Sequence, residues 1–220
     1  MNTQALLSLL HLTSPSLPIG AFAYSQGLES AVEMGWVNSE ESLHEWLSPI
    51  LSHAQANLDI PLLKRLYTAW QADDLAQVQY WQQVLLANRE TRELLQEEQK
   101  LGLTFYRLLG SLGIGLPVQA REFSYLVLFA KACVHYGIDI HGCCSAWLWA
   151  WLENQVAAAC KTVPLGQTSA QKVLLAMMPE IEQAIEHGLA VHDENIGMTL
   201  PAFAMASAWH ETQYSRLFRS

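Results

Sequence analysis

Residues 89–113, RETRELLQEEQKLGLTFYRLLGSLG, decide the fold class. Apolar residues recur there at helical spacing among charged residues, which predicts a helix from 90 to about 111. Glycines and Pro117 then end this helix within the segment 110–118. No convincing alternation of β-branched residues occurs anywhere in the chain, so the sequence predicts an all-α fold.

Outward from this stretch, helical spacing predicts about nine or ten helices in a single domain that spans residues 1–220. Asn38 is the expected cap of one helix, with Glu41 as its capping-box partner, and Asp59 and Pro61 are expected to open another. The expected helices are 4–12, 22–34, 38–56, 59–71, 73–88, 90–111, 121–137, 140–162, 168–188 and 199–214.

The composition is apolar for a soluble protein, with 51% hydrophobic and 15% charged residues, so either the core is large or apolar surface is kept for partners. The net charge of -9 argues against nucleic-acid binding. The longest apolar run, 143–152, is far shorter than the roughly 20 residues of a membrane span. No basic segment precedes the apolar start of the chain, so we expect a cytoplasmic protein without a secretory signal.

Motifs of common enzyme classes are absent. The chain has no GxxxxGK[ST], and the cluster of Gly110, Gly113 and Gly115 follows a helix where a phosphate-binding loop would follow a strand. Neither GxSxG nor HExxH occurs. These absences favour a binding or scaffold protein over an enzyme.

One group of residues offers an alternative, which is a metal-binding protein or a metal-dependent enzyme. The ligand types suit zinc or nickel, but the paired-cysteine spacing of a typical site is missing. Buried cysteines also behave as small hydrophobic residues, which is the simpler interpretation. The candidate ligands are Cys133, His135, His141, Cys143 and Cys144.

The end of the chain, residues 211–220, combines aromatic and basic residues. On a helix, Tyr214, Leu217 and Phe218 would share one apolar face. The segment could pack on its own core or bind a partner, and the residues alone favour neither. Ordering about eight residues costs roughly 8–16 kcal/mol. Burial and hydrogen bonds return about as much, so such a segment should add specificity to a larger interface.

Five segments together resemble the family of urease accessory protein F (UreF). The resemblance extends from Leu9 to Ser220, and the first and last segments are the most specific. The segments are LPIGAFAYSQGLESAVEMGWV (17–37), ANRETRELLQEEQ (87–99), AWLENQV (150–156), PLGQTSAQ (164–171) and HETQYSRLFRS (210–220).

The resemblance implies an all-helical cytoplasmic homodimer without catalytic activity. Such a protein forms a complex with UreD (called UreH in some organisms) and the GTPase UreG, and this complex loads nickel into the urease apoprotein. The family is also implied to modulate GTP hydrolysis by UreG or the fidelity of nickel insertion. Nickel and GTP belong to the partner complex, so no cofactor is expected in this chain.

The resemblance also implies partner-binding residues. They lie around SQGLE, near PLGQ, and in the segment 211–220, which is expected to meet UreD. They are Tyr24, Gln26, Gly27, Glu29, Lys161, Gln167, Gln213, Tyr214, Arg216, Leu217, Phe218 and Arg219. Candidates for an arginine finger toward UreG are Arg121, Arg216 and Arg219.

Three positions depart from the family pattern. Ala21 stands where the family often has glycine, and a left-handed backbone there would be costly. Ala23 replaces a frequent serine, and one hydroxyl contact is expected to be lost. Asn195 replaces an aspartate, which removes the charge expected in that loop.

Overall fold

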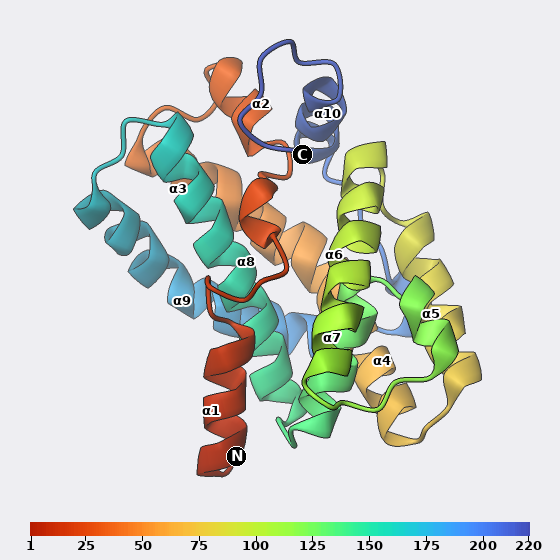
Figure 1. Cartoon of the computed structure of the whole chain (residues 1–220). Coiled ribbons are helices and arrows are strands. Elements are labelled where there is room, and N and C mark those ends of the chain that lie inside the picture. Colours follow the sequence, from red (N-terminus) through yellow and green to blue (C-terminus); the bar gives the residue numbers. More distant parts are fainter.

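The computed structural model describes residues 1–220 and consists of helices joined by short connections, without strands (Figure 1). The predicted all-α fold is therefore confirmed. The α-helices are α1 Thr3–Leu12, α2 Leu28–Glu33, α3 Glu40–Pro49, α4 Ile60–Gln71, α5 Leu75–Ala87, α6 Arg92–Ser111, α7 Tyr125–His135, α8 Ile140–Thr162, α9 Gln167–Ala190 and α10 Pro201–His210. A π-helix covers Ile50–Asp59, and short 3-10 helices cover Ala21–Ala23, Val118–Glu122 and Asp193–Asn195.

Helix α8 lies at the centre of the bundle and packs against α1, α2, α4 and α9 (Figure 1). Its apolar residues surround the helix rather than forming one stripe, as expected for a helix with neighbours on several sides. Asp139 caps it by accepting a hydrogen bond from the Gly142 amide at 2.8 Å. The predicted range 140–162 matches the observed helix.

The predicted break near Asp59 is wrong, because α3, the π-helix and α4 follow one another without interruption from residue 40 to residue 71. Asp59 has helical backbone angles, φ -68 and ψ -46, and its side chain does not cap the helix. Pro49 and Pro61 each remove an N–H from the helical pattern, and the wider π turns lie between them.

Three other predictions need correction. The expected helix 22–34 is divided by a turn at Gln26, because Gln26 adopts a left-handed backbone with φ 52. Ser39 caps α3 in place of Asn38, and its capping-box partner is Ser42 in place of Glu41. Ala21 needs no left-handed backbone, because Gly20 takes that conformation with φ 83.

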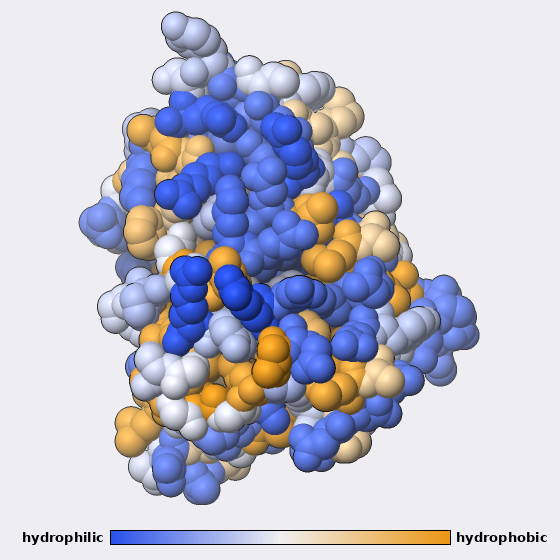
Figure 2. Space-filling view, turned by 45° about the vertical axis from the view of Figure 1, so that its right-hand side comes forward, coloured by the Kyte–Doolittle hydropathy of each residue, from blue (hydrophilic) through white to orange (hydrophobic).

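The apolar excess of the composition is found both in the interior and at the surface. One hydrophobic cluster of 57 buried residues extends through the bundle. Figure 2 shows the side of α5 and α6, where hydrophilic residues cover much of the upper half and hydrophobic residues gather in the lower half. Among the helices, not one has the length and apolar character that crossing a bilayer requires.

A close approach of α9 to α4 and the π-helix tests this packing. A Cβ atom added at Gly188 of α9 would lie 2.6 Å from Ile60 Cγ2 and 2.8 Å from the Ala56 carbonyl oxygen. We expect Gly188→Ala to lower the free energy of unfolding by about 1–3 kcal/mol in urea titrations, because helices must separate. Gly110→Ala is the matched control, since no atom lies within 4 Å of its added Cβ. Equal stability of the two variants would contradict this packing.

Candidate functional site: a polar cavity beside the C-terminal segment

The SQGLE turn, residues 25–29, is fixed by a close approach to α10. Gly27 has φ 81, and a Cβ there would lie 2.7 Å from the Ser207 amide nitrogen. Only glycine fits this contact without displacing α10. The turn thereby directs Glu29, in the first turn of α2, toward the end of the chain.

Glu29 binds the backbone of the C-terminal segment, residues 211–220. Its Oε1 accepts a hydrogen bond from the Leu217 amide at 2.7 Å, and its Oε2 accepts one from the Phe218 amide at 3.0 Å. The residue is buried, with 7% of its surface exposed. Its carboxylate therefore anchors this segment within the same molecule.

His210 joins Glu29 to a second buried carboxylate, Glu93 of α6. The imidazole Nδ1 lies 2.7 Å from Glu93 Oε2, and Nε2 lies 3.2 Å from Glu29 Oε2. Arg216 donates from Nη1 to the other Glu93 oxygen at 2.7 Å. His210 itself has no exposed surface. These four side chains form a compact ionic cluster beneath the C-terminal segment.

The last residues pair with the SQGLE turn through main-chain hydrogen bonds. The Arg219 amide donates to the Ala23 carbonyl at 2.8 Å, and the Ser25 amide donates to the Ser220 carbonyl at 2.7 Å. The Ser25 hydroxyl donates to the same carbonyl. Ser220 Oγ donates to Glu97 Oε2 at 3.1 Å, which connects the segment to α6.

The side chains of the C-terminal segment divide into buried and exposed ones. Phe218 is 6% exposed, and Lys161 Nζ lies 5.4 Å from its ring centre. Tyr214 is fully exposed, and Leu217 is 71% exposed. The prediction of a shared helical face is wrong: α10 ends at His210, and the amides of the segment bind Glu29 instead of continuing a helix.

The other candidates occupy different surroundings. Tyr24 is buried at 3% exposure, and its carbonyl accepts a hydrogen bond from Asn154 Nδ2 at 2.9 Å. Gln167 is exposed in the first turn of α9. Gln213 donates from Nε2 to the Ser215 carbonyl at 3.1 Å. The structure thus brings Gln26, Glu29, Lys161 and the C-terminal segment together, and leaves Gln167 outside their hydrogen-bond network.

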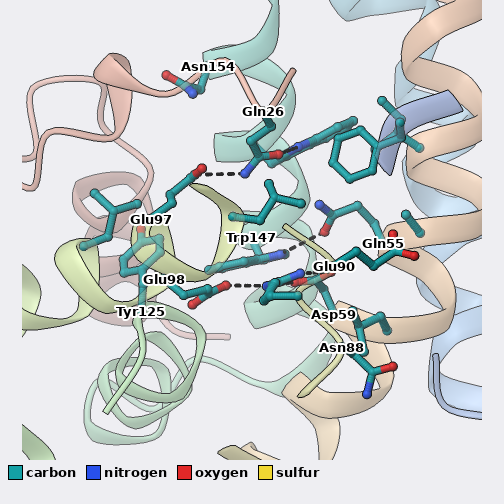
Figure 3. Close-up of a pocket in the computed structure, with 18 of the residues that line it drawn as sticks. Gln26, Gln55, Asp59, Asn88, Glu90, Glu97, Glu98, Tyr125, Trp147 and Asn154 are labelled. Carbon is teal, nitrogen blue, oxygen red and sulfur yellow. Dashed lines mark hydrogen bonds and ion pairs between the residues drawn. The ribbon is translucent and has the colours of Figure 1, made fainter. Parts of the chain in front are cut away.

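Beside this anchoring region, a cavity of about 100 Å³ lies among α6, α8 and the π-helix (Figure 3). Gln26 donates to Glu97 Oε1 at 2.9 Å and accepts from Trp151 Nε1 at 2.9 Å. Trp147 Nε1 donates to Gln55 Oε1 at 3.1 Å. The two indole N–H groups therefore give α8 two polar contacts at the cavity wall.

Arg89 compensates two acids in the same cavity wall. Its Nη2 donates to Asp59 and to Glu98, and its Nη1 donates to Asp59 Oδ2 at 3.3 Å. Burial disfavours the charge of Arg89, but the two carboxylates outweigh burial and raise its pKa. Asp59 lies in the π-helix, and its carboxylate binds Arg89. The side chain therefore does not cap the start of a new helix.

Glu97, also in the cavity wall, forms no ion pair with a cation. Burial is the main cause that raises the pKa of Glu97 to about 7, and the adjacent Glu98 adds to it. Hydrogen bonds from Gln26 and Ser220 and the charge of Arg89 oppose the rise. Glu97 therefore exchanges its proton near neutral pH.

The alternative metal site is not formed. Cys133, Cys143 and Cys144 are buried in the core, whereas His135 and His141 are exposed, so no three metal-ligating residues converge. Burial is the main cause that raises the pKa of Cys144 to about 12. A protonated thiol is a poor ligand. These cysteines are core residues of α7 and α8.

Sequence reasoning missed most of the charged groups of the anchoring region and the cavity wall, namely Asp59, Arg89, Glu93, Glu97, Glu98 and His210. One signal was available in the sequence: Glu93 and Glu97 are four residues apart and share a helix face.

The loop at Asn195, where the family pattern has an aspartate, still carries a negative charge nearby, because Asp193 pairs with Arg65 Nη2 at 2.7 Å.

Comparison with known proteins agrees with the motifs. The family model described as UreF matches residues 37–178, more than half of the chain. A urease accessory protein UreF from Teredinibacter turnerae is 50% identical and covers 100% of both chains. Another, from Chromohalobacter salexigens, is 49% identical over 98% of this chain and 95% of its own length. A third, from Hahella chejuensis, is 45% identical over the whole of both chains.

Fold and site define a class of protein: an all-helical chain whose buried acids hold its own C-terminal segment against the bundle. The full-length identity to its relatives specifies the family within this class. The chain belongs to the UreF family of urease accessory proteins.

Glu97 predicts a pH-dependent stability. Its pKa is raised in the folded state, so its contribution is fully present below the ordinary value of about 4.5 and is lost as pH rises through about 7. We expect Glu97→Gln to remove a decline on the order of 3 kcal/mol between about pH 5 and about pH 8, measured by urea unfolding. Glu182→Gln, at an exposed carboxylate, should keep the decline. A Glu97→Gln profile that follows the original chain would contradict the assignment.

Proposed function

We propose that this chain is a non-catalytic adaptor that bridges UreD (UreH) and the GTPase UreG in the complex that inserts nickel into the urease apoprotein. Membership of the UreF family supports the urease context. The observation that carries the proposal is the C-terminal segment, which is anchored from beneath and leaves Tyr214 and Leu217 facing outward.

An ordered segment lowers the cost of binding. A free segment of this length would lose roughly 1–2 kcal/mol of backbone entropy per residue on association. Here Glu29, Arg216 and Phe218 already fix the backbone within the chain. A partner that covers Tyr214 and Leu217 therefore loses less affinity to ordering. We assign UreD to this surface.

Lys161 joins the same surface. It lies at the C-terminal end of α8, and its ammonium group lies over the Phe218 ring. UreG is the partner that we assign to the neighbouring surface around Lys161 and Gln167. Among the arginine-finger candidates, Arg216 is held by Glu93, whereas Arg121 and Arg219 are exposed and form no ion pair. Arg121 and Arg219 are thus the two that remain available to UreG.

The UreD assignment predicts a selective loss of binding. Replacing both Tyr214 and Leu217 by alanine should weaken UreD binding about 10- to 100-fold, because exposed anchor residues are lost. Thermal stability should not change, since neither side chain is buried. Binding is measured by co-elution and by titration with UreD. Tyr80→Ala, an exposed tyrosine on α5, is the control, and wild-type affinity in the double variant would reject this surface.

The homodimer is assigned to the opposite end of the bundle. On α1, Leu7 is 61% exposed and Leu10 is 55% exposed, and on α9 Leu175 is 61% exposed. Between these helices, Trp149 and Met178 line an open apolar groove. A two-fold axis would place the exposed leucines of α1 of one copy in the groove of the other copy. The surface is therefore complementary to itself.

This dimer surface is tested by charge. Leu7→Glu should convert the dimer to a monomer in size-exclusion chromatography with light scattering, because a carboxylate would be buried without a partner. Val118→Glu is the control, because it introduces the same charge at an apolar residue that is 86% exposed and lies outside both α1 and the groove. A dimer that persists in Leu7→Glu would place the interface elsewhere.

A further inference from the structure

His210 has a hydrogen-bonding arrangement that a neutral imidazole cannot satisfy while both neighbouring carboxylates are ionised. Both ring nitrogens face carboxylate oxygens, Nδ1 toward Glu93 and Nε2 toward Glu29, at 2.7 and 3.2 Å. A neutral imidazole has one N–H, so its second nitrogen would direct a lone pair at an oxygen lone pair. Only the imidazolium form donates to both carboxylates.

The charges lead to the same conclusion. Glu29 and Glu93 are each 7% exposed, and the cation of the cluster besides His210 is Arg216, which pairs with Glu93. With a neutral His210, two buried carboxylates would share one cation. With the imidazolium, the cluster is neutral. A buried unpaired charge costs several kcal/mol, so the docked arrangement favours the protonated ring.

Each element packed around His210 contributes charged side chains to the charge balance of the cluster. Helix α2 contributes Glu29, α6 contributes Glu93, and the C-terminal segment contributes Arg216. At the rim, Glu211 accepts a hydrogen bond from the Arg92 amide at 2.9 Å, and Arg92 Nε lies 3.7 Å from Glu211 Oε2. One helical turn further along α6, Glu97 binds Ser220.

The carboxylates held by His210 are the same ones that hold the C-terminal segment. Glu29 Oε2 accepts hydrogen bonds from both the His210 ring and the Phe218 amide. Glu93 accepts hydrogen bonds from both the His210 ring and Arg216. We propose that docking of the C-terminal segment takes up one proton at His210, and that rising pH releases the segment when this proton is lost.

The consequence concerns the surface assigned to UreD. Release of the segment would leave Tyr214 and Leu217 without a fixed arrangement. Binding of UreD would then again cost the conformational entropy of ordering the segment. This part rests on the proposed function, because it names what regulates the same surface. Docking itself is measured without any partner, so a failure of UreD binding and a failure of proton-linked docking are distinguishable.

The decisive experiment uses the full chain with 4-fluorophenylalanine at position 218. Fluorine NMR reports whether this ring is docked, and the carbon–proton signals of the His210 ring report its protonation. The pH is raised from about 6 until His210 loses its proton. We expect docking to be lost at the same midpoint, with a docking constant that falls up to about tenfold per pH unit. Release at a pH different from that of proton loss would overturn the proposal.

Two variants test whether His210 or Glu97 carries the proton that is linked to docking. His210→Gln cannot titrate, so its docked fraction should not vary with pH. Glu97→Gln removes the other titrating contact of the segment and should retain the pH-dependent release. Loss of the pH dependence in Glu97→Gln would place the proton at Glu97 and reject His210. If His210→Gln fails to fold, the titration of the unsubstituted His210 still decides the question.

Discussion

Buried carboxylates on α2 and α6 impose the constraint on which the rest of this structure depends. An ionised acid in an apolar interior costs several kcal/mol unless donors or cations surround it. Glu29, Glu93, Glu97 and Glu98 all lie in that situation, and their partners come from segments far apart in the sequence. The donors are His210, Arg216, the amides of Leu217 and Phe218, Ser220, Gln26, Arg89 and the Leu126 amide. Satisfying these acids therefore brings the SQGLE turn and the C-terminal segment together on α6.

The apolar scaffold makes this arrangement possible. Helix α8 is surrounded by other helices. Its Trp151 is buried and its Trp147 is partly buried, and their N–H groups reach Gln26 and Gln55. A buried indole is best placed where its single donor finds an acceptor. The same residues thus belong to the core and to the cavity wall. Because Gln26 also binds Glu97, the packing of α8 and the hydrogen bonding of the C-terminal segment are physically connected.

Sequence predicted well where hydrophobic spacing alone determines the structure, as for α8, α6 and the glycine-rich break after α6. It failed where a polar residue had a distant partner. Asp59 resembled a helix start because the sequence cannot show Arg89 nearby. Glu93 and Glu97 did not stand out, because their partners are distant in the sequence. Tyr214, Leu217 and Phe218 had helical spacing, but two hydrogen bonds to Glu29 outweighed it. The motifs indicated the UreF family, which the relatives confirm, whereas the contacts of their residues depend on the tertiary structure.

Anchoring and recognition are separate in the C-terminal segment. The anchoring contacts are largely made by backbone amides, by Arg216 and by the buried Phe218 ring, and all of them face the bundle. The outward side chains Tyr214 and Leu217 contribute nothing to these contacts. A substitution at either position would therefore leave the shape of the segment unchanged while altering what a partner meets. This division explains how the segment can remain ordered on its own and still present the side chains of Tyr214 and Leu217 at the surface.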